Sequence, residues 1–186
     1  MKAHVCPWWF AYTFDNRFRR LFHRPEEVLG PYVKQGMTVM DVGCGIGFFS
    51  IGLARLVGDK GCVLAVDLQQ RMLDILERRA KKAGMAGRIK THRCRPDEIG
   101  IDGTVDFALA FWMVHEVPDT DGFFHQISSI LRPDAKLLIA EPKFHVSFGH
   151  FQEFLSSARR NGLRQYANPS IRLSWSALLD MYSYNS

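Results

Sequence analysis

Short apolar runs alternate with longer amphipathic segments along the chain from Met37 onward. Such runs are typical of strands that are buried on both faces of a sheet. Five runs predict strands, and the third of them is the most polar: TVMDVG (38–43), GCVLAVD (61–67), RIKTHRC (88–94), VDFALAF (105–111) and AKLLIAE (135–141).

The segments between these runs place apolar side chains three and four residues apart, which is typical of helices with one buried face. Met72, Leu76 and Ala80 form one such stripe. A helix between two consecutive strands makes those strands parallel, so the pattern predicts a doubly wound α/β sheet. The predicted helices cover residues 47–58, 69–84, 119–133 and 147–162.

The two ends of the chain differ from this alternation. Two strand-like pieces, 163–168 and 170–179, flank Pro169 and predict a hairpin at one edge of the sheet. Residues 1–35 contain a cluster of aromatics, some at helical spacing, and we expect a helical cap over the carboxyl edge of the sheet, with the main domain at 36–186. The seven aromatics of this cluster are Trp8, Trp9, Phe10, Tyr12, Phe14, Phe18 and Phe22.

The turn after the first strand has the spacing Gly43-x-Gly45-x-Gly47. A dinucleotide-binding loop favours glycine where Phe48 stands, and Phe48 is expected to hinder close packing of the following helix. Asp67 ends the second strand, where an acid can bind the two hydroxyls of a ribose. Asp41 precedes the glycines, and its charge would repel a pyrophosphate but attract a cation. These features favour S-adenosylmethionine, which combines a ribose and a sulfonium without a phosphate.

With these motifs the chain resembles the class I S-adenosylmethionine-dependent methyltransferases, in particular the type 11, ubiquinone-biosynthesis-like group. VMDVGCGIG and VLAVDLQQRMLD are similar to the first two motifs of the family, and VDFALAFWMVHEVPD and LRPDAKLLIAEP to those of strands four and five. The resemblance covers about residues 30–175. It implies a Rossmann-like, mostly parallel sheet of seven strands in the order 3-2-1-4-5-7-6, with the last strand antiparallel.

The resemblance also implies a role for each matching residue. Asp67 would bind the ribose, Leu68 and Met72 would contact the adenine, and Ala110 and Phe111 would lie near the transferred methyl group. The residues implied around the methionine part are Asp41, Gly43, Cys44, Gly45 and Gly47.

One position departs from the family pattern. Members of the family often have an Asp after the third strand that binds the adenine amino group, and Arg95 occupies that place. Two arrangements stay open: backbone groups of Arg95 and Pro96 bind the adenine, or Asp97 does.

Methyl transfer from a sulfonium requires orientation and a dry pocket, and a base only when the acceptor is protonated. His115, which follows strand four, is the first candidate base, and His145 and Glu141, at the end of strand five, are the others. A structural role for each of the three is the alternative. Cys44 could bind a metalloid, but without a cluster of cysteines in sequence it favours packing. No metal is expected.

Charge adds a competing function. Residues 71–95 hold nine Lys/Arg against two Asp/Glu, a net charge of +7 within a chain of +5. Such a belt could bind RNA, or it could be the solvated face of a helix and strand; few aromatics are interleaved to stack bases. We therefore expect a small-molecule methyltransferase, and keep an RNA methyltransferase and a non-catalytic cofactor-binding module as alternatives. A nicotinamide-dependent oxidoreductase conflicts with Phe48 and Asp41.

The remaining expectations concern the location of the protein. No apolar run reaches the roughly 18 residues that a membrane span needs, and the first residues lack the pattern of a secretory signal. The four cysteines form no C-x-x-C pair. We expect a cytoplasmic protein that acts on a small-molecule substrate and has no membrane partner, and the sequence leaves the oligomeric state open.

Overall fold

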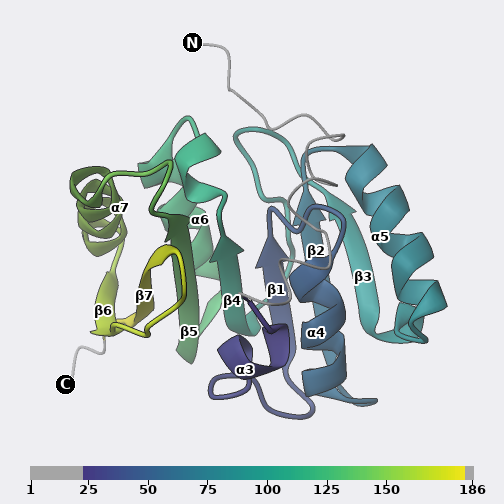
Figure 1. The fold of residues 1–186 in the computed structure, drawn as a ribbon. Coiled ribbons are helices and arrows are strands. Elements are labelled where there is room, and N and C mark those ends of the chain that lie inside the picture. The colour runs from purple at the N-terminus through teal and green to yellow at the C-terminus, as the bar shows by residue number, and fades with distance from the viewer. Residues whose placement is uncertain (1–22, 183–186) are drawn as a thin grey trace.

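The computed structural model describes residues 23–182 and contains a seven-stranded sheet in the order β3-β2-β1-β4-β5-β7-β6 (Figure 1). Strands β1 to β5 pair in parallel, whereas β7 is antiparallel to both β5 and β6. The strands are β1 (Thr38–Val42), β2 (Cys62–Asp67), β3 (Ile89–Arg93), β4 (Val105–Phe111), β5 (Leu131–Pro142), β6 (Leu163–Ala167) and β7 (Ser174–Met181). The predicted fold class, strand order and antiparallel edge hairpin are confirmed.

Helices connect the strands and cover both faces of the sheet (Figure 1). The α-helices are α3 (Pro25–Leu29), α4 (Phe48–Val57), α5 (Gln70–Lys82), α6 (Thr120–Ile130) and α7 (Phe148–Arg160). Two short 3₁₀ helices, η1 (Ala86–Arg88) and η2 (Val114–Glu116), precede β3 and follow β4.

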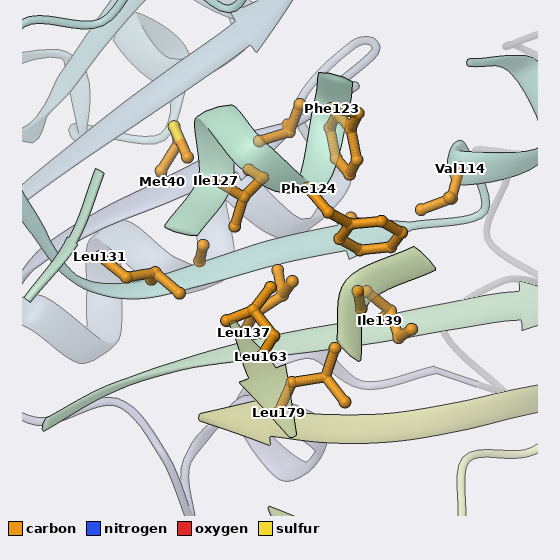
Figure 2. Packing of buried hydrophobic residues seen from close by; sticks show 14 of the residues in the cluster. Met40, Val114, Phe123, Phe124, Ile127, Leu131, Leu137, Ile139, Leu163 and Leu179 are labelled. Carbon is orange, nitrogen blue, oxygen red and sulfur yellow. The ribbon is translucent and has the colours of Figure 1, made fainter. Parts of the chain in front are cut away.

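The two-residue repeat of each strand divides the core into two layers. In β1, Met40 belongs to a cluster with α6 and α7, part of which Figure 2 shows, whereas Val39 belongs to a cluster with α3 and α4. A third cluster joins α5 to Ala65 of β2. Because both faces of the sheet are covered, the polar groups that remain reachable gather at the ends of the strands.

The boundary between α6 and β5 differs from the prediction. The helix ends at Ile130, three residues before Pro133, and β5 begins at once at Leu131. A residue that precedes proline is driven away from the helical region, so Arg132 favours an extended backbone. Proline therefore lies inside the strand, near a register shift in its pairing with β4.

The described part of the segment 1–35 packs at two places. His23 is buried against Phe111 and Trp112 at the end of β4. Helix α3 then runs beside the second half of α4, where Glu26 pairs with Arg55 at 2.7 Å. Helix α3 therefore packs on α4 and the core, and the aromatics at positions 8–22, on which the predicted cap depends, lie outside the described residues.

Gly47 allows close packing between α4 and α5. Its φ is +85°, and a Cβ at this position would lie 2.0 Å from Cδ1 of Leu76. Phe48 does not hinder this packing, contrary to expectation, because its side chain lines the cavity described below. The glycine that permits close packing of the following helix is thus Gly47 and does not need to stand at position 48.

Gly47→Ala is expected to destabilise the fold by about 2–4 kcal/mol, because a left-handed alanine and an overpacked contact add their costs. Gly45 also has a positive φ, of +53°, but no atom lies within 4 Å of the place that a Cβ would occupy there. Gly45→Ala should therefore cost only the conformational part, about 1–2 kcal/mol. Urea unfolding of both variants measures the difference, and equal losses would contradict the packing role of Gly47.

Candidate active site

A cavity of about 960 Å³ opens at the carboxyl edge of the sheet. Its walls come from the segments that follow β1, β2, β3, β4 and β5. The carboxyl ends of parallel strands meet at this edge, which is where open α/β sheets bind ligands. The volume is near the upper end of the roughly 300–1,000 Å³ that ligand clefts occupy, so a cofactor and a second small molecule can share it.

The glycine loop forms the floor at one end of the cavity. Gly43, with φ +66°, lies so close to Met113 that a Cβ would contact it at 2.8 Å, whereas Gly45 faces open space. Arg79 of α5 donates a hydrogen bond to the carbonyl of Ile46 at 2.8 Å. The N-terminus of α4 follows, and the dipole of this helix gives its first turn a partial positive charge. Helix α5 therefore holds the glycine loop through Arg79, while the space beside Gly45 is open to a ligand.

Two buried carboxylates flank this loop. Asp67 accepts hydrogen bonds from the amides of Gly45 and Gln69, each at 2.9 Å. Asp41 is only 2% exposed and accepts from the hydroxyl of Ser50 at 2.5 Å. Burial raises the pKa of Asp67, and the hydrogen bonds from the amides of Gln69 and Gly45 oppose that rise. Both acids line the cavity, so this end suits a cationic ligand with hydroxyl groups.

The cysteines of the cavity are held as neutral thiols. Burial raises the pKa of Cys44 well above its usual value, and the charges of Asp41 and Asp67 raise it further. Burial and Asp67 likewise raise the pKa of Cys94 to about 11. Because the thiolate is the form that binds soft metals, this environment disfavours a metalloid site. Among residues 23–182 no three His, Cys, Asp or Glu side chains are placed to hold a metal ion.

The loop after β3 forms the far wall of the cofactor end. Arg95 and Glu98 form an isolated bridge, with the Arg95 amide donating to the Glu98 carbonyl at 2.9 Å and their side chains ion-paired. The side-chain amide of Gln126 donates a hydrogen bond to the backbone carbonyl of Asp97 at 3.0 Å, which connects this loop to α6. Arg95, Pro96 and Asp97 all line the cavity, so both predicted arrangements for the adenine stay open.

The other end of the cavity contains a carboxylate–imidazole pair. Glu141 is fully buried, and its Oε1 accepts from the amides of Met113 and Val114 at 3.2 and 2.9 Å. Its Oε2 is hydrogen-bonded to Nδ1 of His115. Burial lowers the pKa of His115, but the hydrogen bond and the charge of Glu141 outweigh burial, so the pKa is raised overall. His115 therefore favours its charged form more than a free histidine does.

His145 joins this pair at the cavity wall. Its ring centroid lies 4.8 Å from that of His115, at an interplanar angle of 69°. His145 is exposed and lies in the turn that follows β5. Its backbone amide donates a hydrogen bond to the carbonyl of Pro142 at 3.0 Å. The three candidate acid–base residues of the sequence thus meet at one place, although they come from two strands.

An aromatic wall faces these histidines. Trp112 has φ +59°, a rare value for a bulky residue, and its indole nitrogen donates to the hydroxyl of Ser174 at 2.9 Å. Phe144 packs edge-on against Trp112 at 5.4 Å, and Phe111 lies on its other side at 5.6 Å. Trp112, Phe144 and the acid Glu116 also line the cavity but were not predicted from the sequence. Their positions just after β4 and β5 are the one feature of the sequence that could have indicated them.

Most of the predicted site residues lie in the wall of this one cavity. Gly47, Ala110 and Glu141 do not line it and instead support residues that do. The predicted residues in the wall are Asp41, Gly43, Cys44, Gly45, Asp67, Leu68, Met72, Arg95, Pro96, Asp97, Phe111, His115 and His145.

The basic belt of residues 71–95 covers α5, η1 and the edge strand β3. Several of its arginines already have partners within the chain. Arg79 donates to a carbonyl of the glycine loop, Arg88 pairs with Asp59, and Arg95 pairs with Glu98. The belt thus lies at the cofactor end and away from the histidines. No helix within residues 23–182 has the length and apolar character that crossing a bilayer requires.

Comparison with known proteins agrees with this geometry. The family model described as "Methyltransferase domain" matches residues 33–175. The structure of an S-adenosylmethionine-dependent methyltransferase from Aquifex aeolicus superposes with a TM-score of 0.85 at 25% identity, over 96% of this chain and 100% of that one.

Two relatives with named activities match this chain over only part of their own length. The demethylmenaquinone methyltransferase of Lactobacillus johnsonii is 26% identical over 90% of this chain and 59% of its own length. The ubiquinone/menaquinone biosynthesis C-methyltransferase UbiE of Cellvibrio japonicus is 31% identical over 59% of this chain and 44% of its own. The chain thus spans about half the length of these relatives.

The raised pKa of His115 predicts a pH-dependent contribution to stability. Because the pKa is higher in the folded state, the contribution is complete below the unfolded value of about 6.5 and is lost as the pH rises through the folded value. Urea unfolding should show the free-energy advantage of the wild type over His115→Gln/Glu141→Gln shrinking as the pH rises above about 6.5. An advantage that stays constant or grows would contradict the pairing.

Proposed function

The chain belongs to the methyltransferase-domain family, in its class I, S-adenosylmethionine-dependent form, and from this premise we propose that it methylates a small, largely apolar molecule. One observation carries the proposal: a single cavity joins an acidic end around Gly45 to an aromatic end with a histidine pair. The names of the relatives from quinone biosynthesis support an acceptor of this kind.

The acidic end fits the cofactor. Gly45 leaves open space where a side chain would intrude, and Asp67 presents a carboxylate that is already oriented by two amides. Asp41 places negative charge beside the expected sulfonium and ammonium groups. When bound, S-adenosylmethionine supplies an activated methyl group, and S-adenosylhomocysteine is the product.

The aromatic end fits the acceptor. The rings of Phe111, Trp112 and Phe144 offer flat apolar surfaces to a planar molecule. Nδ1 of His115 is committed to Glu141, which leaves Nε2 to take a proton from the acceptor. Glu141 holds the imidazole in that orientation and stabilises the charge that His115 gains. We propose His115 as the general base and His145 as its neighbour at the cavity wall.

A small acceptor is favoured over RNA by the position of the charges. The basic belt lies on α5 and β3, at the cofactor end, whereas the histidines lie beyond β4 and β5. The cavity wall beside the histidines is made by aromatic rings and by Glu116, and Arg95 at the cofactor end is the one Lys or Arg among the described residues of the wall. We also propose a cytoplasmic location, which the free thiols of Cys44, Cys62 and Cys94 support.

Calorimetry with S-adenosylmethionine and S-adenosylhomocysteine tests the cofactor. Asp67→Asn should weaken binding about 10–100-fold, because hydrogen bonds to a charged acceptor are worth about 1.5–3 kcal/mol. Asp102→Asn, at an exposed site outside the cavity wall, is the matched control. An unchanged affinity in Asp67→Asn would disprove the ribose assignment, and absence of binding by the wild type would disprove the proposed function.

Transfer to a panel of hydroxylated aromatic acceptors tests the base. Because the pKa of His115 is raised, kcat/KM of the wild type should climb as the pH rises above about 6.5. His115→Gln should lower the rate about 10²–10⁴-fold and remove that limb of the profile. An unaltered profile in the variant would assign the proton to another group; a turnover number of zero on every acceptor, with cofactor bound, would favour a non-catalytic module.

A further inference from the structure

Three exposed apolar side chains gather beside the mouth of the cavity. Phe144, Phe148 and Leu173 are 62%, 54% and 44% exposed, and we call them the mouth patch. Phe144 belongs to the connection between β5 and α7, Phe148 is the first residue of α7, and Leu173 belongs to the turn between β6 and β7. The amide of Lys143 donates to the carbonyl of Leu173 at 3.0 Å, so the two segments are joined.

Two tryptophans hold the patch from behind. Phe148 packs on Trp175 at 4.9 Å, as Phe144 packs on Trp112 at 5.4 Å. Each indole nitrogen is fixed by a hydrogen bond, from Trp175 to the carbonyl of Val146 at 3.0 Å and from Trp112 to Ser174. Phe144 and Phe148 are therefore each held against a fixed indole and remain more than half exposed.

Leu173 occupies a strained backbone conformation. Its φ is +61°, in the left-handed region that glycine and asparagine tolerate and a bulky apolar residue rarely adopts. An exposed leucine gains little from packing within its own chain, so the fold does not repay this strain. Strain that local packing does not explain is typical of functional positions.

The two segments that carry the mouth patch contain cations and no acid, although Glu116 lies in the cavity wall nearby. The segments 142–149 and 168–175 contain Lys143 and Arg172 and no Asp or Glu. The ammonium of Lys143 lies 4.5 Å from the ring centre of Trp175, at the base of the patch. Segments that combine exposed aromatic and aliphatic side chains with cations match the interface of a bilayer that carries anionic lipid.

The patch is continuous with the cavity. Phe144, Pro142 and His145 line the cavity, while Phe148 and Leu173 lie outside its wall. An apolar molecule that leaves a bilayer at Phe144 would reach the histidines without crossing open water.

We propose that the mouth patch docks on the surface of a phospholipid bilayer and that the apolar acceptor enters the cavity from there. The expectation of no membrane partner rested on the lack of a spanning run, and surface docking needs none. Docking is independent of the methyl transfer; the route of the acceptor rests on the proposed function.

Sedimentation with lipid vesicles tests the docking. The full chain should bind vesicles of phosphatidylcholine with about one third phosphatidylglycerol, and bind them more weakly in pure phosphatidylcholine or at high salt. Phe148→Ser/Leu173→Asn should lower the partition coefficient at least about ten-fold, since both apolar tips are lost. Tyr166→Ser is the matched control, because Tyr166 is 60% exposed but lies over Lys136, near Asp180 and away from the mouth.

The single variant Leu173→Asn separates docking from folding. Asparagine tolerates a positive φ, so thermal stability should be unchanged or raised while vesicle binding falls about three-fold or more. A merely structural Leu173 would give the opposite result, a loss of stability with unaltered vesicle binding.

Three outcomes overturn the proposal. The wild type fails to bind either vesicle; or the double variant binds as the wild type does; or gel filtration shows a dimer that the double variant abolishes while vesicles are ignored, which assigns the patch to a second copy of the chain. Calorimetry with S-adenosylmethionine on the same samples keeps these results distinct from failure of the proposed function, since neither Phe148 nor Leu173 lines the cavity.

Discussion

The hydrogen bond between the amide of Gly45 and the carboxylate of Asp67 joins the segments that follow β1 and β2, and the cofactor end depends on it. Glu141 makes the corresponding connection at the other end, where it binds the amides of Met113 and Val114 after β4. In each case a buried carboxylate at the tip of one strand fixes the loop of its neighbour. The cavity is shaped by these two cross-strand connections.

These buried charges determine the chemistry of nearby groups. A carboxylate that is removed from water needs compensation, and here backbone amides and the imidazole of His115 supply it. Burial, together with the charge of Asp67, raises the pKa of Cys44 and of Cys94, while the hydrogen bond and the charge of Glu141 raise the pKa of His115. A cavity that disfavours thiolates and stabilises the positive charge that His115 gains suits a cationic cofactor and an acceptor that gives up a proton.

The sequence was sufficient for the fold and for the cofactor end, because both depend on local patterns. Apolar runs locate the strands, and the spacing of Gly43, Gly45 and Gly47 before a helix locates the loop. The acceptor end depends on contacts between distant segments. The hydrogen bond between Glu141 and His115 therefore cannot be predicted from any spacing in the sequence. Phe48 shows the limit even for a local motif, since the side chain expected to obstruct helix packing instead lines the cavity.

The cofactor end and the acceptor end of the cavity also differ in backbone strain. Only Trp112 and Leu173 have a positive φ among the non-glycine residues of the described chain, and both lie at the acceptor end. At the cofactor end the same left-handed conformations are taken by glycines, which adopt them at little cost. Bulky apolar residues in that conformation lower stability, so their retention needs a benefit outside the folded core. A wall for the acceptor at Trp112 and a contact with lipid at Leu173 would each provide one.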